Sequence, residues 1–268
     1  MNTMKLQHAA KIAIKSAKIA GKNLMTQFGN VKSRTKTDGS LITSADSISN
    51  RLIKTEILKA DPSADFLSEE NTELRLKNKY GRLWVIDPLD GTTNYVNGLP
   101  MWAISIALID NLDILIGVIH LPLLKVTILA IKGKGTFRNG TKVSVKHPIG
   151  NQFKDIFTFC SWRSNNFASN LEGNIRAFGS TAYNFAQFAS GHTLGGWELF
   201  PRIWDIGAGI LIVREAGGFI GDLKGNDIYE KIKKTRKLHK DVLPCIYATS
   251  ESLYFRMLND YIKTSLVR

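Results

Sequence analysis

Residues 84–95 read Trp84-Val85-Ile86-Asp87-Pro88-Leu89-Asp90-Gly91-Thr92-Thr93-Asn94-Tyr95. The apolar run Leu83–Ile86 predicts a buried strand, and Pro88 and Gly91 predict that this strand ends at once. Asp87 and Asp90 are three residues apart across the predicted turn, so both carboxylates can converge on one point. Two carboxylates that close repel each other unless a cation or a proton lies between them. The string therefore predicts a site for a hard divalent cation.

The next residues predict an anion site in the same turn. Gly91, Thr92 and Thr93 would open a helical turn whose free backbone N–H groups can hold an anionic oxygen. Asp-Pro and Asp-Gly pairs are also common turn formers, so the pattern D-P-x-D by itself leaves a purely structural turn open.

The whole string resembles the signature of the inositol monophosphatase family of magnesium-dependent, lithium-sensitive phosphatases, W-[VI]-[IV]-D-P-[IL]-D-G-T-T-N-[YF]. A second motif of that family lies downstream as Trp204-Asp205-Ile206-Gly207-Ala208-Gly209, continuing as Val213-Arg214-Glu215-Ala216-Gly217-Gly218. The resemblance extends from the first helix to about residue 248. It implies the layered α-β-α-β-α sandwich that inositol monophosphatases share with fructose-1,6-bisphosphatases. The implied halves are an N-terminal α+β half, residues 1–147, with most of the metal ligands, and a C-terminal α/β half, residues 148–268, in one catalytic unit.

The resemblance also implies a set of metal ligands. They are the side chains of Glu69, Asp87, Asp90 and Asp205 and the backbone carbonyl of Leu89. Oxygen ligands without histidine or thiolate suit Mg²⁺ or Mn²⁺ rather than zinc, with two or three ions expected from the family. Without the resemblance, Glu69 and its neighbour Glu70 would be solvent-facing, and Asp205 would be an aspartate at a helix start. Ser68 and Asn71 depart from the family pattern G-E-E-S around Glu69.

The same resemblance assigns catalytic and substrate-binding roles. Asp46 and Thr92, with Glu69, would position or deprotonate the attacking water, whereas Asp46 alone reads as a carboxylate favoured by a helix N-terminus. Gly91, Thr92 and Thr93 would bind the phosphate, and Glu198 would contact inositol hydroxyls. Arg202 is either a surface arginine or a ligand for a second substrate phosphate.

The implied reaction is the metal-dependent hydrolysis of inositol 1-phosphate or a related sugar phosphate. The form D-G-T-T-N favours these substrates over histidinol phosphate and 3'-phosphoadenosine 5'-phosphate, whose phosphatases usually carry D-G-T-K. Fructose 1,6-bisphosphate stays open as an alternative. A different class also stays open, because bacterial members of the extragenic-suppressor type act with the transcription machinery on ribosomal RNA synthesis. Family members are commonly dimers.

Composition bounds the class of protein. The 268 residues are 44% hydrophobic and 22% charged, which is ordinary for a globular chain. Lys and Arg number 36 against 23 Asp and Glu, and the net charge of +13 favours anionic partners unless it reflects an AT-rich genome. Cys160 and Cys245 form no motif and suggest free thiols in a reducing cytosol. No apolar run approaches the length of a membrane span, so we expect a cytoplasmic protein.

Periodicity predicts the remaining elements. We expect helices over 4–28, 44–59, 179–189, 204–216 and from about 250 to 263, and strands over 156–160, 193–199 and 245–249. A meander is expected over 102–131 and a hairpin over 133–145. The basic, acid-free start also fits an organellar transit peptide. The charge run Lys231–Lys240 predicts a solvated loop, and its lack of aromatic residues gives no support to nucleic-acid stacking.

Overall fold

The computed structural model of the chain describes residues 3–35, 41–70, 81–145, 155–159, 171–234 and 238–266. Asn71, Cys160 and residues 36–40 lie outside these ranges. Within them, all the expected helices and strands are present with boundaries shifted by a few residues. No helix among the described residues is long and apolar enough to cross a membrane.

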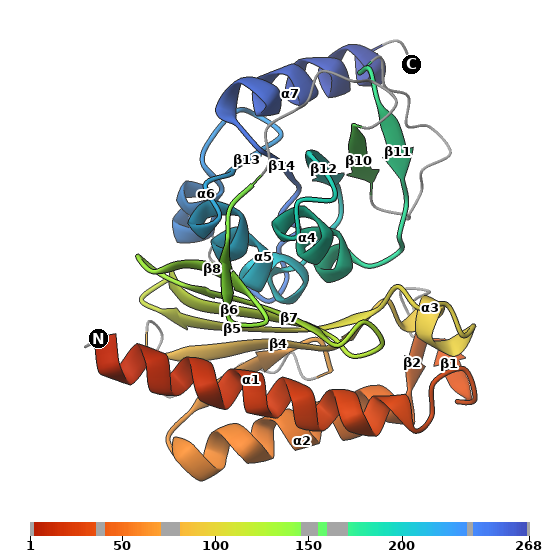
Figure 1. Cartoon of the computed structure of the whole chain (residues 1–268), viewed down its shortest axis with the longest axis vertical. Coiled ribbons are helices and arrows are strands. Elements are labelled where there is room, and N and C mark those ends of the chain that lie inside the picture. The colour runs from red at the N-terminus through yellow and green to blue at the C-terminus, as the bar shows by residue number, and fades with distance from the viewer. Residues whose placement is uncertain are drawn as a thin grey trace.

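Helices and sheets alternate in five layers (Figure 1). Helices α1 (Thr3–Met25) and α2 (Ser44–Ala60) form the first layer and cover one face of the larger sheet. Helices α4 (Thr181–Ala189) and α5 (Ile203–Glu215) lie between the two sheets, and α7 (Glu251–Leu266) covers the far face of the smaller sheet. This order confirms the predicted α-β-α-β-α sandwich.

The larger sheet has seven strands in the order β3-β4-β5-β6-β7-β8-β9. Strand β3 runs parallel to β4, and all the later neighbours are antiparallel. The predicted meander and hairpin are therefore confirmed. The bounds are β3 (Asp65–Ser68), β4 (Leu83–Asp90), β5 (Ala103–Asp110), β6 (Asp113–Leu121), β7 (Val126–Ile131), β8 (Gly135–Arg138) and β9 (Thr141–Val143).

The predicted end of β4 is wrong. The strand passes through Pro88 and ends at Asp90, and the short helix α3 (Thr92–Val96) follows. Asp87 pairs with Ser105 and Asp90 with Ala103, so three steps along β4 oppose two along β5. Because this bulge leaves one residue out of the ladder, proline can be accommodated there without its N–H group.

The smaller sheet has the order β11-β10-β12-β14-β13. Strand β10 (Ile156–Phe159) is parallel to β11 (Asn174–Arg176) and β12 (Gly195–Glu198), whereas β14 (Cys245–Ala248) is antiparallel to β12 and β13 (Phe219–Asp222). Strands β11 and β13 were not predicted, because such short segments have too few residues for an alternating pattern. A separate pair, β1 (Ser33–Thr35) with β2 (Leu41–Thr43), leads into α2.

Three apolar clusters join the layers. One lies between the first helices and the larger sheet, where the small side chains of Ala13, Ala17 and Ala20 let α1 approach closely. The largest contains residues of the larger sheet together with α4 and α5, and so draws on both sides of residue 147. The third joins the smaller sheet to α7. The division into two halves at residue 147 stays a prediction.

The basic segment is only partly the loop that was predicted. Lys231, Lys233 and Lys234 lie in the last turn of helix α6 (Ile228–Lys234). Ile228 and Ile232 are buried and anchor this helix to the core, while its lysines stand at the end that the helix dipole makes favourable for cations. Residues 235–237 lie outside the described ranges.

Candidate active site

The end of β4 is the centre of the candidate site. Ser68 at the end of β3 pairs with Ile86 of β4, and the N–H of Glu69 donates to the Ile86 carbonyl at 3.2 Å. Since β3 and β4 are parallel, this register sets Glu69 beside Asp87. The family-derived ligand and the first motif aspartate therefore meet at one edge of the sheet.

Helix α5 brings Asp205 to the same place. The carbonyl of Trp204 accepts a hydrogen bond from Ser105 Oγ at 3.2 Å, and Ser105 is the strand partner of Asp87. Asp205 Oδ2 accepts from the backbone N–H of Arg202 at 2.6 Å, which fixes the carboxylate in the first turn of the helix.

Asp90 is tied to the start of α4. Its Oδ2 accepts from Ser180 Oγ at 2.7 Å and from the N–H of Ala182. Ser180 is the N-cap of α4 and was not among the predicted site residues. The signal was present, because a serine directly before a helical apolar pattern predicts an N-cap whose partners include nearby carboxylates.

The electrostatics of these carboxylates are unfavourable without a cation. Burial raises the pKa of Asp87 and that of Asp205 well above the usual range, and the neighbouring Glu69 and Asp90 carboxylates raise both further. Burial raises the pKa of Asp90 to about 6, against the lowering effect of its Ser180 and Ala182 hydrogen bonds. The causes that lower these three pKa values are hydrogen bonds, including the one from the Arg202 backbone N–H to Asp205, and no described lysine or arginine side chain is among them.

A divalent cation fits this donor set. Like charges held close together are stabilised either by protons or by metal ions, and oxygen-only donors select hard cations. In the described ranges, no three Asp, Glu, His or Cys side chains are already arranged as a closed metal cage. Small side-chain movements of the carboxylates would therefore accompany binding of an ion.

Asp46 and Thr92 are in contact. Thr92 Oγ is 3.1 Å from Asp46 Oδ1 and 3.0 Å from the Leu89 carbonyl. Asp46 Oδ2 accepts from the N–H and the hydroxyl of Thr43, which closes a capping box at the start of α2. Burial raises the pKa of Asp46, and the hydrogen bonds from Thr43 and Thr92 lower it. Asp46 is thus both the helix-start carboxylate and the partner of Thr92.

Gly91 sets the geometry of the turn. Its φ of 90° is in the left-handed region, and a Cβ there would lie 2.9 Å from the Met101 carbonyl. Its N–H contributes to lowering the pKa of Asp90, so the amide is directed at that carboxylate. Of the three backbone N–H groups predicted to bind phosphate, those of Thr92 and Thr93 therefore remain candidates.

Glu198 lies at the end of β12 and is fully buried. Its oxygens accept from Thr181 Oγ at 2.8 Å and Asn184 Nδ2 at 2.7 Å. Burial raises its pKa to about 7, and these two hydrogen bonds oppose the rise. Thr181 and Asn184 were not predicted, so the first turns of α4 hold both Asp90 and Glu198.

Arg202 contacts the C-terminal part of the chain, and its role at a second substrate phosphate stays a prediction. Its guanidinium donates to the backbone carbonyl of Lys240 in the C-terminal loop. The backbone N–H of Arg202 therefore contacts the site through its hydrogen bond to Asp205, whereas the side chain is bonded to the Lys240 carbonyl.

Solved structures place this architecture in the fold class of inositol monophosphatases and fructose-1,6-bisphosphatases. The extragenic suppressor protein suhB from Bartonella henselae has a TM-score of 0.81 at 31% identity, with 94% of this chain and 97% of that chain covered. The model of the inositol monophosphatase family matches residues 5–253, and the chain belongs to this family.

Curated relatives carry three kinds of name. The inositol-1-monophosphatase of Mesorhizobium japonicum and the fructose-1,6-bisphosphatase/inositol-1-monophosphatase of Thermotoga maritima are each 34% identical, over 80% of this chain and 85% of their own length. The Nus factor SuhB of Xylella fastidiosa is 32% identical over 82% of this chain and 83% of its length. The family of the chain is thus settled, and the names of these relatives differ in the function that they state.

Proposed function

We propose that the chain is a Mg²⁺-dependent phosphomonoesterase that hydrolyses inositol 1-phosphate or a related sugar phosphate. The observation that carries the proposal is that Glu69, Asp87, Asp90 and Asp205 lie together at the end of β4. Burial raises the pKa of the three aspartates, and the neighbouring carboxylates raise the pKa of Asp87 and Asp205 further. Membership of a family of phosphatases supports the same reading.

These four side chains and the Leu89 carbonyl would hold two or three Mg²⁺ ions, or Mn²⁺. When bound, such ions activate a water molecule, neutralise the phosphoryl oxygens and stabilise the leaving oxygen. The parallel pair β3–β4 and the start of α5 are rigid elements, so they hold the carboxylates close to where the ions are needed.

Thr92 and Asp46 would orient the attacking water. Thr92 donates its hydroxyl proton to Asp46 Oδ1 or to the Leu89 carbonyl, so its oxygen lone pairs remain available to accept from a water molecule. Asp46 is fixed by two bonds from Thr43, and can take up the proton that the water gives through Thr92. The N–H groups of Thr92 and Thr93 would meet the phosphate oxygens.

Glu198 would select the substrate. A carboxylate held at two points by α4 is a good acceptor for the hydroxyl groups of a polyol, and a site built to bind hydroxyls discriminates strongly against substrates that lack them. This favours inositol 1-phosphate and sugar phosphates over substrates with an apolar alcohol. Fructose 1,6-bisphosphate remains the alternative, supported by the name of the Thermotoga maritima relative.

A phosphate-release panel tests the proposal. Inositol 1-phosphate, fructose 1,6-bisphosphate, histidinol phosphate and 3'-phosphoadenosine 5'-phosphate are compared with Mg²⁺ and with EDTA. We expect turnover that requires Mg²⁺ and prefers one of the first two substrates. Preference for the adenine nucleotide would refute the substrate assignment, and full activity in EDTA would refute the metal mechanism.

A second candidate belongs to another class. The net charge of +13 and the similarity to the Nus factor SuhB of Xylella fastidiosa favour a role with the transcription machinery, in a homodimer or with an RNA-bound partner. Both roles can coexist in a cytoplasmic protein. Copurification with RNA polymerase or ribosomal RNA leader, retained by a variant that lacks phosphatase activity, would identify the second role.

A further inference from the structure

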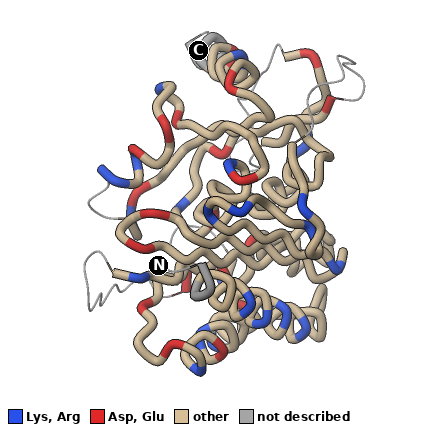
Figure 2. The backbone as a smooth tube through the Cα atoms, turned by 60° about the vertical axis from the view of Figure 1, so that its left-hand side comes forward, with Lys and Arg blue, Asp and Glu red and all other residues tan. Residues whose placement is uncertain are grey.

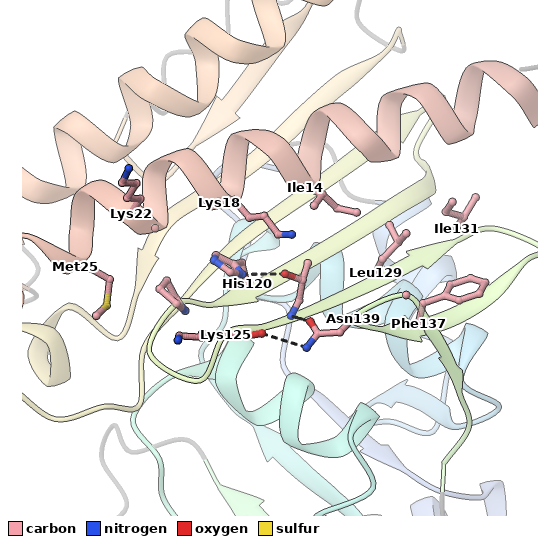
Figure 3. Close-up of a pocket in the computed structure, with 14 residues that line it drawn as sticks. Ile14, Lys18, Lys22, Met25, His120, Lys125, Leu129, Ile131, Phe137 and Asn139 are labelled. Carbon is pink, nitrogen blue, oxygen red and sulfur yellow. Dashed lines mark hydrogen bonds between the residues drawn. The ribbon is translucent and has the colours of Figure 1, made fainter.

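A second concave site lies under the larger sheet, on the face that α1 covers. A cavity of about 690 Å³ opens between the C-terminal half of α1 and strands β6, β7 and β8 (Figure 3). None of its lining residues belongs to the candidate active site. Its volume is in the range of pockets that bind small organic molecules, roughly 300–1,000 Å³.

The charge of the lining is entirely positive. Lys18, Lys22 and Lys125 line the cavity, and no aspartate or glutamate does. None of the three lysines forms an ion pair with any residue that the structure describes. Helix α1 carries no acidic residue, and its lysines recur along its length (Figure 2). A cationic concavity with apolar walls concentrates anions more strongly than an exposed helix face does.

His120 adds a buried polar group to the wall. The side chain is 8% exposed, and Nδ1 lies 3.1 Å from the Val126 carbonyl and 3.0 Å from Thr127 Oγ. A carbonyl only accepts, so Nδ1 carries the proton and Nε2 is left as an acceptor. Nε2 has no hydrogen-bond partner among the described residues. Burial lowers the pKa of the ring, and Lys18 extends from α1 into the cavity beside His120 (Figure 3), close enough for its charge to lower this pKa further.

The remaining lining is apolar and preformed. Ile14 and Met25 on α1 face Leu129, Ile131 and Phe137 on the sheet. At the rim, Asn139 accepts from the Thr127 N–H at 2.8 Å and donates to the Lys125 carbonyl at 3.1 Å. These bonds tie the turn between β8 and β9 to strand β7 and to the turn before it, and so fix the rim of the cavity.

Close packing of α1 keeps the ring in place. A Cβ at Gly21 would lie 2.9 Å from His120 Cδ2 and from Pro122 Cγ. Only glycine therefore lets the helix approach the histidine at this point, and the approach brings Lys18 and His120 to one end of the cavity.

We propose that this cavity is a second binding site, separate from the candidate active site, for a small amphiphilic anion. The anionic head, a phosphate or a carboxylate, lies between Lys18, Lys125 and His120, and an apolar body fills the space between Ile14, Leu129 and Phe137. A protonated head such as a monohydrogen phosphate satisfies both kinds of group, because its hydroxyl donates to Nε2 while its charged oxygens meet the lysines.

Fluorescence titration of the full chain with 8-anilinonaphthalene-1-sulfonate in Mg²⁺ tests the site. We expect saturable binding that octyl phosphate or octanoate displaces and that octanol does not; the stronger of the two competitors identifies the head group. The matched variants are Lys18→Gln and Lys11→Gln, which remove the same charge from the same helix. Lys11 is exposed and does not line the cavity. Lys18→Gln should weaken binding by about fivefold or more, and Lys11→Gln should leave it unchanged.

A second variant tests the volume, and an NMR signal tests the location. Leu129→Trp fills the apolar end and should abolish probe binding without unfolding the chain, as circular dichroism would confirm. The His120 ring resonance, assigned with His120→Asn, should shift when octyl phosphate is added to the native chain. Three results would each overturn the proposal. They are equal weakening of binding by both lysine variants, unchanged binding by Leu129→Trp, and a His120 resonance that does not move. Asp87→Asn should bind the probe normally, so failure of this site is distinguishable from failure of the proposed catalysis.

Discussion

Replacing Thr92 by valine isolates the water-orienting step, because valine keeps the shape of threonine and removes only the hydroxyl. The substitution removes the 3.1 Å contact to Asp46 and the 3.0 Å contact to the Leu89 carbonyl. A hydrogen bond to a buried charged group contributes about 1.5–3 kcal/mol. Asp46 keeps both bonds from Thr43, so we expect a loss near the lower end, about 1–2 kcal/mol of unfolding free energy.

The expected loss of activity is larger than the loss of stability. Removing a group that transfers or orients a proton costs on the order of 10²–10⁴-fold in rate. We therefore expect kcat for inositol 1-phosphate to fall by about 10²-fold or more at saturating Mg²⁺, with KM little changed. Thr26→Val is the matched control. The Thr26 hydroxyl also donates to a backbone carbonyl, that of Asn23 at 2.7 Å, and Thr26 is not one of the residues of the candidate site.

A double-mutant cycle with Asp46→Asn decides whether the two residues act as one unit. If they do, the double variant loses about as much kcat as either single variant, because the second change removes nothing further. Steady-state phosphate release gives the rates, and thermal unfolding gives the stabilities. A kcat of Thr92→Val within threefold of native, or fully additive losses in the cycle, would show that Thr92 and Asp46 do not act together on the water.

Further changes probe the charges. Asp87→Asn removes one of the mutually repelling carboxylates, so Tm in EDTA should rise while phosphate release in Mg²⁺ is abolished; a fall in Tm would contradict the electrostatic account. Burial raises the pKa of Glu198 to about 7 and that of Asp90 to about 6, so their protonated forms stabilise the metal-free fold at low pH. The unfolding free energy in EDTA should therefore fall as pH rises from about 4 through 7, and Glu198→Gln should flatten the upper part of the curve. Lithium should inhibit at millimolar concentrations, and rates unaffected by it would place the chain outside the lithium-sensitive group. Arg202→Ala should leave KM for fructose 1,6-bisphosphate unchanged, because the guanidinium is bonded to the Lys240 carbonyl; a raised KM would restore its role at a second phosphate.

The layered fold was predictable because long elements carry strong periodic patterns. The apolar face of α1 and the strands of the meander have enough residues to fix both type and order. Short elements carry no such pattern and could not be predicted, since β11 has three residues and β13 has four. The end of β4 was misjudged because Pro88 normally terminates a ladder, whereas the extra residue between Asp87 and Asp90 creates a position that needs no N–H donor.

Site residues that lie close together in one segment could be predicted from the sequence. Contacts between distant segments could not, because they depend on the tertiary structure. Asp87 and Asp90 lie in one string, but the bonds from Ser180 and Ala182 to Asp90 cross from the other half of the chain. The direction of the Arg202 side chain likewise depends on a loop 38 residues away. No pattern within a single segment contains that information.

Titration with Mn²⁺ measures directly whether the carboxylates of the candidate site bind metal ions. Free Mn²⁺ is measured by electron paramagnetic resonance during titration of the native chain and of Asp205→Asn, with Asp110→Asn as a control for an acidic residue outside the site. We expect two or three bound ions that Mg²⁺ displaces. At least one of them should be lost or strongly weakened in Asp205→Asn, and none should change in Asp110→Asn. Identical binding by all three proteins, or no binding by the native chain, would contradict the proposed metal site.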